Sequence, residues 1–246
     1  MKLRVRFSKL GKVRFTSHRD VARIWERALR KAAVPVAYTE GFNPHPKLHF
    51  GLALPTGYES LGEYLDIDVR PDGDAEPMSF PARLDPCLPV GFHVQAADEV
   101  APGTPSLQQA VVSCTWRIEV SGTDASPAVL AEHVERLLGA EVLVTTRERK
   151  GQQVTDDLRP AILGLEAEDR TLVAELATQP RGLRPSELVG LLGPGVDEVR
   201  GTRIHQWTMT DGALAEPLPL ATPATSAMRR EHPDVRAFEH AGEPPG

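Results

Sequence analysis

The sequence predicts an α+β protein made of two ferredoxin-like (β-α-β-β-α-β) halves with antiparallel sheets, followed by a disordered C-terminal tail. Short alternating apolar runs, amphipathic helical segments after early strands, and a Pro/Gly spacer at 101–105 support this class. The same order of elements recurs on both sides of the spacer without a residue-level repeat, so the duplication is inferred from the pattern alone. The halves are expected at 1–100 and 106–210, and the tail at 211–246.

The first half is expected to open with a strand and a helix. Apolar residues alternate with basic ones at Leu3, Val5 and Phe7. A turn leads to a short second strand at 13–16. Ser17 is expected to cap a helix, with Asp20 as its capping-box partner, and Pro35 ends that helix. The remaining elements are expected as a strand at 36–38, a Pro- and Gly-rich loop at 41–58, a strand around 64–69, a weak helix near 76–86 and a strand at 91–96.

The second half repeats this order. Its elements are expected as a strand at 111–120, a helix at 127–138 capped by Ser126, a strand at 141–148, a hairpin of 161–167 and 171–176, a short helix at 184–192 and a strand at 199–209. The segment 211–246 is rich in Ala, Pro, Thr and Glu and has no apolar periodicity. Such a composition predicts disorder.

Positive charge is concentrated at the N-terminal end. Through residue 49 the chain carries twelve Lys or Arg against three acidic residues, a net of +9, whereas the whole chain carries −6. Charge segregated in this way indicates a polyanionic partner such as RNA. On the first helix, a face opposite the apolar one holds four arginines, which could bind successive phosphates: Arg19, Arg23, Arg27 and Arg30. The alternative is a solvated helix face on which Glu26 pairs with Arg30.

The loop Gly-Phe-Asn-Pro-His-Pro at 41–46 is expected to hold a fixed shape. Proline fixes its own φ and pushes its neighbour to extended geometry, so the loop presents Asn43 and His45 rigidly. The alternative is a structural loop that packs on the sheet through Phe42, Leu48 and Phe50. The predicted nucleic-acid-binding residues are Arg14, Arg19, Arg23, Arg27, Arg30, Asn43, His45 and Lys47.

Three histidines also suggest a metal site. His18, His45 and His49 could bind a metal ion with Asp20 or Glu63 as fourth ligand. Pro46 sits inside the spacing of His45 and His49, so these two do not match the His-x-x-x-His pair of a helical site, and no metal is expected.

The same region allows a catalytic alternative, a metal-independent ribonuclease. His18 and His45 would act as base and acid, and Lys47 would stabilise the charge on the phosphorane.

Missing motifs argue against several enzyme classes. The sequence has no P-loop, no dinucleotide-binding glycine motif and no nucleophile elbow. Two cysteines, Cys87 and Cys114, cannot supply the three thiolates of a radical SAM cluster. No cofactor is therefore expected, and catalysis by the chain itself is not favoured. The low cysteine count and the absence of an apolar run of roughly 20 residues predict a cytoplasmic protein without membrane contact.

Residues 14–69 resemble the radical SAM-linked protein family. The resemblance is carried by Ser-His-Arg-Asp at 17–20, which opens the helix, and by the loop at 41–46; a second match covers 149–162. Members are found fused to, or encoded beside, radical SAM proteins with a cobalamin-binding region. The resemblance implies an accessory or substrate-presenting role with such an enzyme as partner, and it supplies no catalytic residues.

The sequence thus predicts a non-catalytic accessory protein that binds RNA or presents substrate to a separate radical SAM enzyme. The alternatives are the ribonuclease and a protein-binding adaptor whose basic face meets an acidic partner.

Overall fold

The computed structural model describes residues 1–70, 76–149 and 151–220. The first half contains the β-α-β-β-α-β order that the sequence predicts, with short 3₁₀ turns between the elements. Its elements are β1 (Lys2–Lys9), η1 (Gly11–Phe15), α1 (His18–Lys31), β2 (Leu48–Phe50), β3 (Glu59–Asp68), η2 (Pro77–Ser79), α2 (Phe80–Leu84), η3 (Asp85–Cys87) and β4 (Phe92–Glu99).

The second half follows the same order with an extra hairpin inserted after its first helix. Its elements are α3 (Leu107–Ala110), β5 (Val111–Ser121), α4 (Pro127–Gly139), β6 (Val144–Arg149), β7 (Gln152–Asp157), η4 (Arg159–Ala161), β8 (Ile162–Glu168), β9 (Thr171–Ala177), α5 (Pro185–Gly190), β10 (Asp197–Thr210) and β11 (Ala213–Ala215). The pair β6–β7 forms a separate two-stranded sheet.

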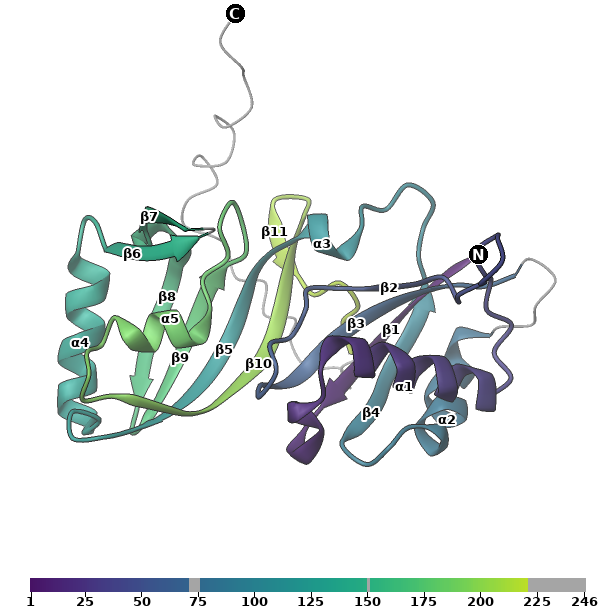
Figure 1. Cartoon of the computed structure of the whole chain (residues 1–246), viewed down its shortest axis with the longest axis horizontal. Helices are drawn as coiled ribbons and strands as arrows, with labels where there is room; N and C mark the ends of the chain where they lie inside the picture. Colours follow the sequence, from purple (N-terminus) through teal and green to yellow (C-terminus); the bar gives the residue numbers. More distant parts are fainter. Residues whose placement is uncertain (71–75, 150, 221–246) are drawn as a thin grey trace, which may run out of the picture.

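The two halves share one nine-stranded sheet, whose main order is β4-β1-β3-β10-β5-β9-β8, with β2 added to β3 and β11 to β10. Figure 1 shows the helices α1, α2, α4 and α5 in front of this sheet. All pairings are antiparallel except that of β3 with β10, which is parallel and covers only two residue pairs, Thr202–Glu59 and Arg203–Ser60. The α+β class is confirmed, but the expected antiparallel sheets are joined into one mixed sheet.

β2 and β10 use the same edge of β3 in succession. β2 pairs with its C-terminal part, where Phe50 lies opposite Leu65, and β10 pairs with its first residues. Between these two pairings the edge of β3 is bridged by side chains. The amide of Gln206 donates to the carbonyl of Gly62 at 2.7 Å, and Arg203 binds Glu63. The junction of the halves is therefore a polar seam.

Strand β1 is buried on both faces. Leu3, Val5 and Phe7 belong to the core beneath α1, together with Trp25. The alternate residues Arg4 and Arg6 point to the opposite face and are also buried. A strand that alternates apolar and charged residues usually leaves its charged side in water. Here the chain that follows β11 covers that side.

Several local predictions need correction. The expected strand at 13–16 is the 3₁₀ helix η1, and the expected strand at 36–38 is reduced to isolated bridges of Val36 and Tyr38. The expected loop at 41–58 contains β2, and the strands β7 and β11 were not predicted. Of the predicted tail, 211–220 is ordered and contains β11, whereas 221–246 lies outside the described residues.

Candidate nucleic-acid interface

Helix α1 begins where the sequence predicts. Ser17 adopts an extended N-cap conformation, and its Oγ accepts a hydrogen bond from the backbone N–H of Asp20 at 3.2 Å. The Asp20 carboxylate accepts from the Ser17 hydroxyl at 2.7 Å and lies near the positive end of the helix dipole. At the other end Arg83 donates to the carbonyl of Ala32 at 3.1 Å, which satisfies a terminal acceptor of the helix. Both ends of the helix that carries the arginines are thus fixed.

The predicted division of α1 into two faces is confirmed. Its buried side chains are Val21, Trp25, Ala28 and Leu29, and its exposed ones include Arg19, Arg23, Arg27 and Arg30. Arg23 lies 3.4 Å from Asp20, but both side chains are more than half exposed, so this pair contributes little. Among the described residues Arg19, Arg27 and Arg30 form no ion pair, and the alternative pair of Glu26 with Arg30 does not form. Four guanidinium groups therefore line the solvent side of α1.

Other basic residues of the N-terminal block are already engaged. Arg4 donates two hydrogen bonds to the Asp66 carboxylate, at 2.7 and 2.9 Å, and Arg6 forms an ion pair with Glu216. The ammonium of Lys9 is buried and donates to the carbonyls of Arg14 and Thr16, at 3.3 and 3.0 Å. Part of the +9 charge is therefore internal to the fold.

Arg14, one of the predicted binding residues, is only partly exposed. Its guanidinium lies over the ring of Phe15 at 4.8 Å and 3.9 Å from Glu59. Among the predicted arginines it is the least available to a phosphate.

The loop at 41–46 stands on a fixed frame. The N–H of Thr39 donates to the carbonyl of His45 at 2.9 Å, and the N–H of His45 donates to Thr39 Oγ1 at 3.0 Å. Gly41 adopts a φ of 124°, which favours glycine. The tip residues, including Asn43, are exposed and Phe42 is fully so. The structural alternative fails for Phe42 but holds for Leu48 and Phe50, which pack against the core beneath α1.

The histidines separate into two places. The ring of His18 meets the edge of Phe50, with ring centroids 5.2 Å apart, and His18 and His49 line a common surface pocket. His49 Nε2 lies 3.3 Å from Asp68. Among the described residues, no contact joins His45 to His18 or His49. No contact therefore supports the ribonuclease alternative, which stays a prediction.

A metal site likewise receives no support from the described part of the chain, which contains no cluster of three His, Cys, Asp or Glu side chains suited to a metal ion.

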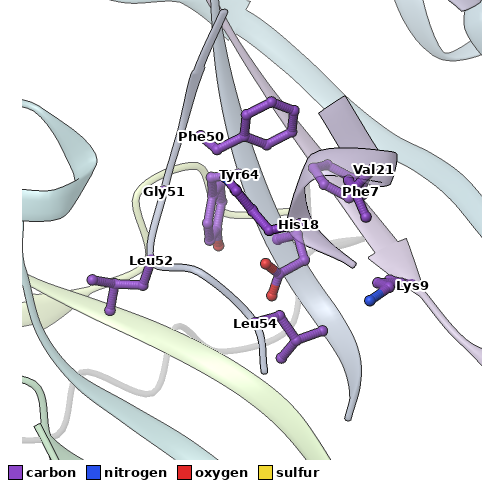
Figure 2. Close-up of a pocket in the computed structure, with 10 residues that line it drawn as sticks. Phe7, Lys9, His18, Val21, Phe50, Gly51, Leu52, Leu54 and Tyr64 are labelled. Atoms are coloured by element: carbon purple, nitrogen blue, oxygen red, sulfur yellow. The ribbon is translucent and has the colours of Figure 1, made fainter. Parts of the chain in front are cut away.

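A small cavity lies between the start of α1, the end of β2 and the middle of β3. Figure 2 shows His18, Phe50, Leu54 and Lys9 around it. Its volume is about 20 Å³, space for roughly one water molecule and not for a nucleotide. Burial lowers the pKa of Lys9, although the nearby Glu63 carboxylate opposes this shift. The cavity is thus a packing feature beside a buried charge cluster.

Glu63 and Arg203 form the centre of that cluster. Two nitrogens of Arg203 donate to the Glu63 carboxylate at 2.6–3.0 Å, and one also donates to the carbonyl of Leu52 at 2.8 Å. Burial disfavours the charge on Arg203, but Glu63 and Cys114 together outweigh it and the pKa of Arg203 is raised. The guanidinium also lies over the ring of Trp116 at 5.4 Å. The pair joins the two halves.

Sequence reasoning considered Glu63 only as a metal ligand and did not single out Arg203. A signal was present, because Glu63 has the same strand parity as Leu65 and Ile67, which face the core. A carboxylate at an inward position requires a buried partner. The sequence did not reveal which cation would meet it.

No helix in the described part of the chain is both long and apolar enough to cross a membrane. Residues 2–185 match a family model described as "Uncharacterized protein conserved in bacteria (DUF2344)". No curated protein matches the chain.

Proposed function

The chain belongs to DUF2344, a family of uncharacterized proteins conserved in bacteria, and we propose that it is a non-catalytic accessory protein that binds RNA and presents it to a separate radical SAM enzyme. The observation that carries the RNA-binding part is the solvent-exposed arginine row of α1. The proposal of a radical SAM enzyme as partner is based on the resemblance of residues 14–69 to the radical SAM-linked family.

The arginine row has dimensions suited to a phosphate backbone. From Arg19 to Arg30 the helix rises eleven residues, about 16 Å at 1.5 Å per residue. Guanidinium groups bind phosphate oxygens through paired N–H donors. Because Arg23 is the one member of the row with an ion-pair partner among the described residues, the row retains its positive potential. A row of this length can contact several successive phosphates.

The loop at 41–46 supplies groups that could contact bases. Asn43 carries an amide of the kind that pairs with base edges, and Lys47 adds a cation for phosphate. Beside them the fully exposed ring of Phe42 provides a surface on which an unpaired base can stack. His45 completes this exposed set. The frame of the loop holds these groups in a fixed arrangement, which lowers the entropy cost of binding.

The accessory role also fits the two thiols. Cys114 is buried, and burial raises its pKa to about 11, so this thiol is held protonated. With Cys87 as the remaining cysteine, the chain cannot assemble a three-thiolate cluster of its own. Radical chemistry would have to come from the partner.

We also propose that each half is a ferredoxin-like unit. The first half has the sheet order β4-β1-β3 with β2 beside β3, and the second has β10-β5-β9-β8. In both halves the first and third strands are central and the second and fourth lie outside. The hairpin β6–β7 is then an insertion in the second unit.

A titration with a structured RNA pool at two salt concentrations tests RNA binding. We expect affinity to fall steeply with salt because phosphate binding releases counterions. The double variant Arg23→Glu/Arg27→Glu should bind more weakly and lose part of the salt dependence. Arg170→Glu, an exposed arginine in the β8–β9 turn, is the matched control. Salt-independent binding, or equal weakening in the control, would contradict the proposal.

Full exposure of Phe42 favours the protein-binding adaptor as a second candidate. Co-purification of the chain with partner proteins from its host distinguishes the two. If Phe42→Ala abolishes capture of a protein while RNA affinity is unchanged, the loop serves a protein partner.

A further inference from the structure

The sheet face opposite the helices is crossed by the last described segment of the chain. β10 turns through Asp211 and Gly212 into β11, which pairs with it over three residues. The chain then reaches β1, where Arg4 donates to the carbonyl of Pro217 at 3.4 Å and Arg6 to that of Leu218 at 3.3 Å. We refer to residues 213–220 as the C-terminal strap.

The strap places one carboxylate between two basic side chains. Glu216 accepts from Arg6 Nη1 with one oxygen, and its other oxygen lies 2.7 Å from His205 Nδ1. The side chains of Arg6 and Glu216 are 4% and 13% exposed, so this contact is largely shielded from water. Arg6 is held in place by Gln95, whose Oε1 accepts from Arg6 Nε at 3.1 Å. The arrangement is a built anion site.

The site contains a further donor that the strap does not use. Tyr64 is 1% exposed, and its hydroxyl has no hydrogen-bond partner among the described residues. The Arg6 guanidinium lies over the ring of Tyr64, with its central carbon 5.8 Å from the ring centroid. Buried hydroxyls without a partner are uncommon in folded proteins. An anion with more acceptor oxygens than a carboxylate could use this donor.

An aromatic surface adjoins the site. The ring of Trp207 lies 5.0 Å from the ring of His205, with an angle of 32° between their planes. Its Nε1 donates to Thr115 Oγ1 at 2.8 Å, which fixes the orientation of the indole, and the side chain remains partly exposed. A cation site beside an accessible aromatic ring is a common combination for single-stranded nucleic acids.

We propose that Arg6, His205 and Tyr64 form a second phosphate site for single-stranded RNA, beside the stacking surface of Trp207, and that Glu216 fills this site until RNA displaces the strap. This inference rests on the proposed function, since RNA is the ligand class. Arginine and imidazole donors bind phosphate and carboxylate alike, and a phosphate offers more oxygens to satisfy Tyr64.

The strap then acts as an internal competitor. The apparent affinity for RNA equals the intrinsic affinity of the open site multiplied by the fraction of molecules in which the site is open. Removing the charge of Glu216 weakens its hold on Arg6 and His205 and should raise that fraction. Because the β10–β11 pairing covers only three residues, its loss leaves the nine-stranded sheet otherwise paired.

The test is a titration of the full chain with a short oligouridylate and, separately, with inorganic pyrophosphate, followed by tryptophan fluorescence. Glu216→Gln should bind the oligouridylate on the order of tenfold more tightly than wild type, the effect of losing one charged hydrogen bond. Glu166→Gln, the same change at an exposed position, should leave affinity unchanged. Arg6→Gln in the Glu216→Gln background removes both partners together and should abolish the gain.

A second variant keeps the test independent of the folding of Glu216→Gln. Gly212 has a φ of 77°, which a β-branched residue disfavours, so Gly212→Val should loosen the strap with Glu216 intact and also tighten binding. Unchanged affinity in both variants, or a gain that survives Arg6→Gln, would overturn the site. A gain for pyrophosphate alone would overturn the assignment to RNA. If the arginines of α1 do not bind RNA, the variant Arg23→Glu/Arg27→Glu will keep wild-type RNA affinity. That result is distinguishable from failure of the second site.

Discussion

Glu63 on β3 and Arg203 on β10 form a buried ion pair that joins the two halves across the shortest pairing in the main order of the sheet. The pair lies 140 residues apart in sequence, and its side chains are 11% and 3% exposed. β3 and β10 pair through only two residue pairs, and this ion pair and the Gln206–Gly62 hydrogen bond extend the contact along the seam.

Glu63→Gln should destabilise the protein by about 3–5 kcal/mol, because it leaves the buried charge of Arg203 without a counter-ion. Urea unfolding followed by circular dichroism measures the loss. The double variant Glu63→Leu/Arg203→Met removes both charges and should recover most of the stability. An equal loss in the double variant would mean that packing, rather than charge, holds the seam.

Gly201→Ala should also destabilise the seam. A Cβ at Gly201 would overlap the ring of Tyr58. That ring is held in place because its hydroxyl donates a hydrogen bond to the Glu198 carboxylate at 2.9 Å. Overpacking of this kind costs about 1–3 kcal/mol. Gly190→Ala is the matched control, since a Cβ at the end of α5 meets nothing within 4 Å. Similar melting temperatures for the two variants would contradict the close approach of Tyr58.

Changes in the loop at 41–46 should affect binding but not the stability of the fold. His45→Ala should weaken RNA or partner binding without lowering the melting temperature, because the His45 backbone rather than its ring holds the frame. Thr39→Val removes the Oγ1 acceptor and should loosen the loop, which amide hydrogen exchange of His45 can detect. RNA cleavage by the wild type in chelator that disappears in His45→Ala would instead support the ribonuclease alternative.

Stability should fall on acidification partly through Glu216. Burial alone would raise its pKa, but hydrogen bonds from His205 and Arg6 outweigh this effect, and the pKa of Glu216 is lowered from 4.5. A group with a lowered folded pKa stabilises the fold above its unfolded pKa, and the effect is lost as pH falls through the folded value. The other charged or titratable groups facing this site are Arg4, Tyr64 and Asp66.

Unfolding free energies of wild type and Glu216→Gln, measured from neutral pH to below pH 4.5, check this prediction. The difference between the two proteins should be largest at neutral pH and should vanish as Glu216 is protonated. A constant difference across the series would show that the charge of Glu216 does not contribute.

The parts of the fold that the sequence predicted are governed by local rules. α1 follows from an N-cap at Ser17 and a 3.6-residue apolar period, and both depend on residues within a few turns of each other. The hairpin β8–β9 follows from two alternating runs on either side of a short polar turn at 168–170. The exposure of the arginine row was predictable for the same reason.

What the sequence did not predict depends on distant partners. The alternation in β1 suggested a basic, half-exposed strand, but Arg4 and Arg6 are neutralised by Asp66 and Glu216, far away along the chain. One missed element did have a local signal. Asp211 and Gly212 have φ values of 51° and 77°, as a tight hairpin turn requires, and Asp-Gly is a strong sequence sign of such a turn.

The parallel seam also sets an order of events during synthesis. The strands of the first half are complete when residue 99 has left the ribosome. The edge of β3 that pairs with β10 stays unpaired until roughly another hundred residues have been synthesised. During that interval Glu63 has no Arg203, and an open strand edge is exposed to neighbouring nascent chains. Premature termination between β4 and β10 would therefore leave a product able to fold locally and inclined to aggregate through β3.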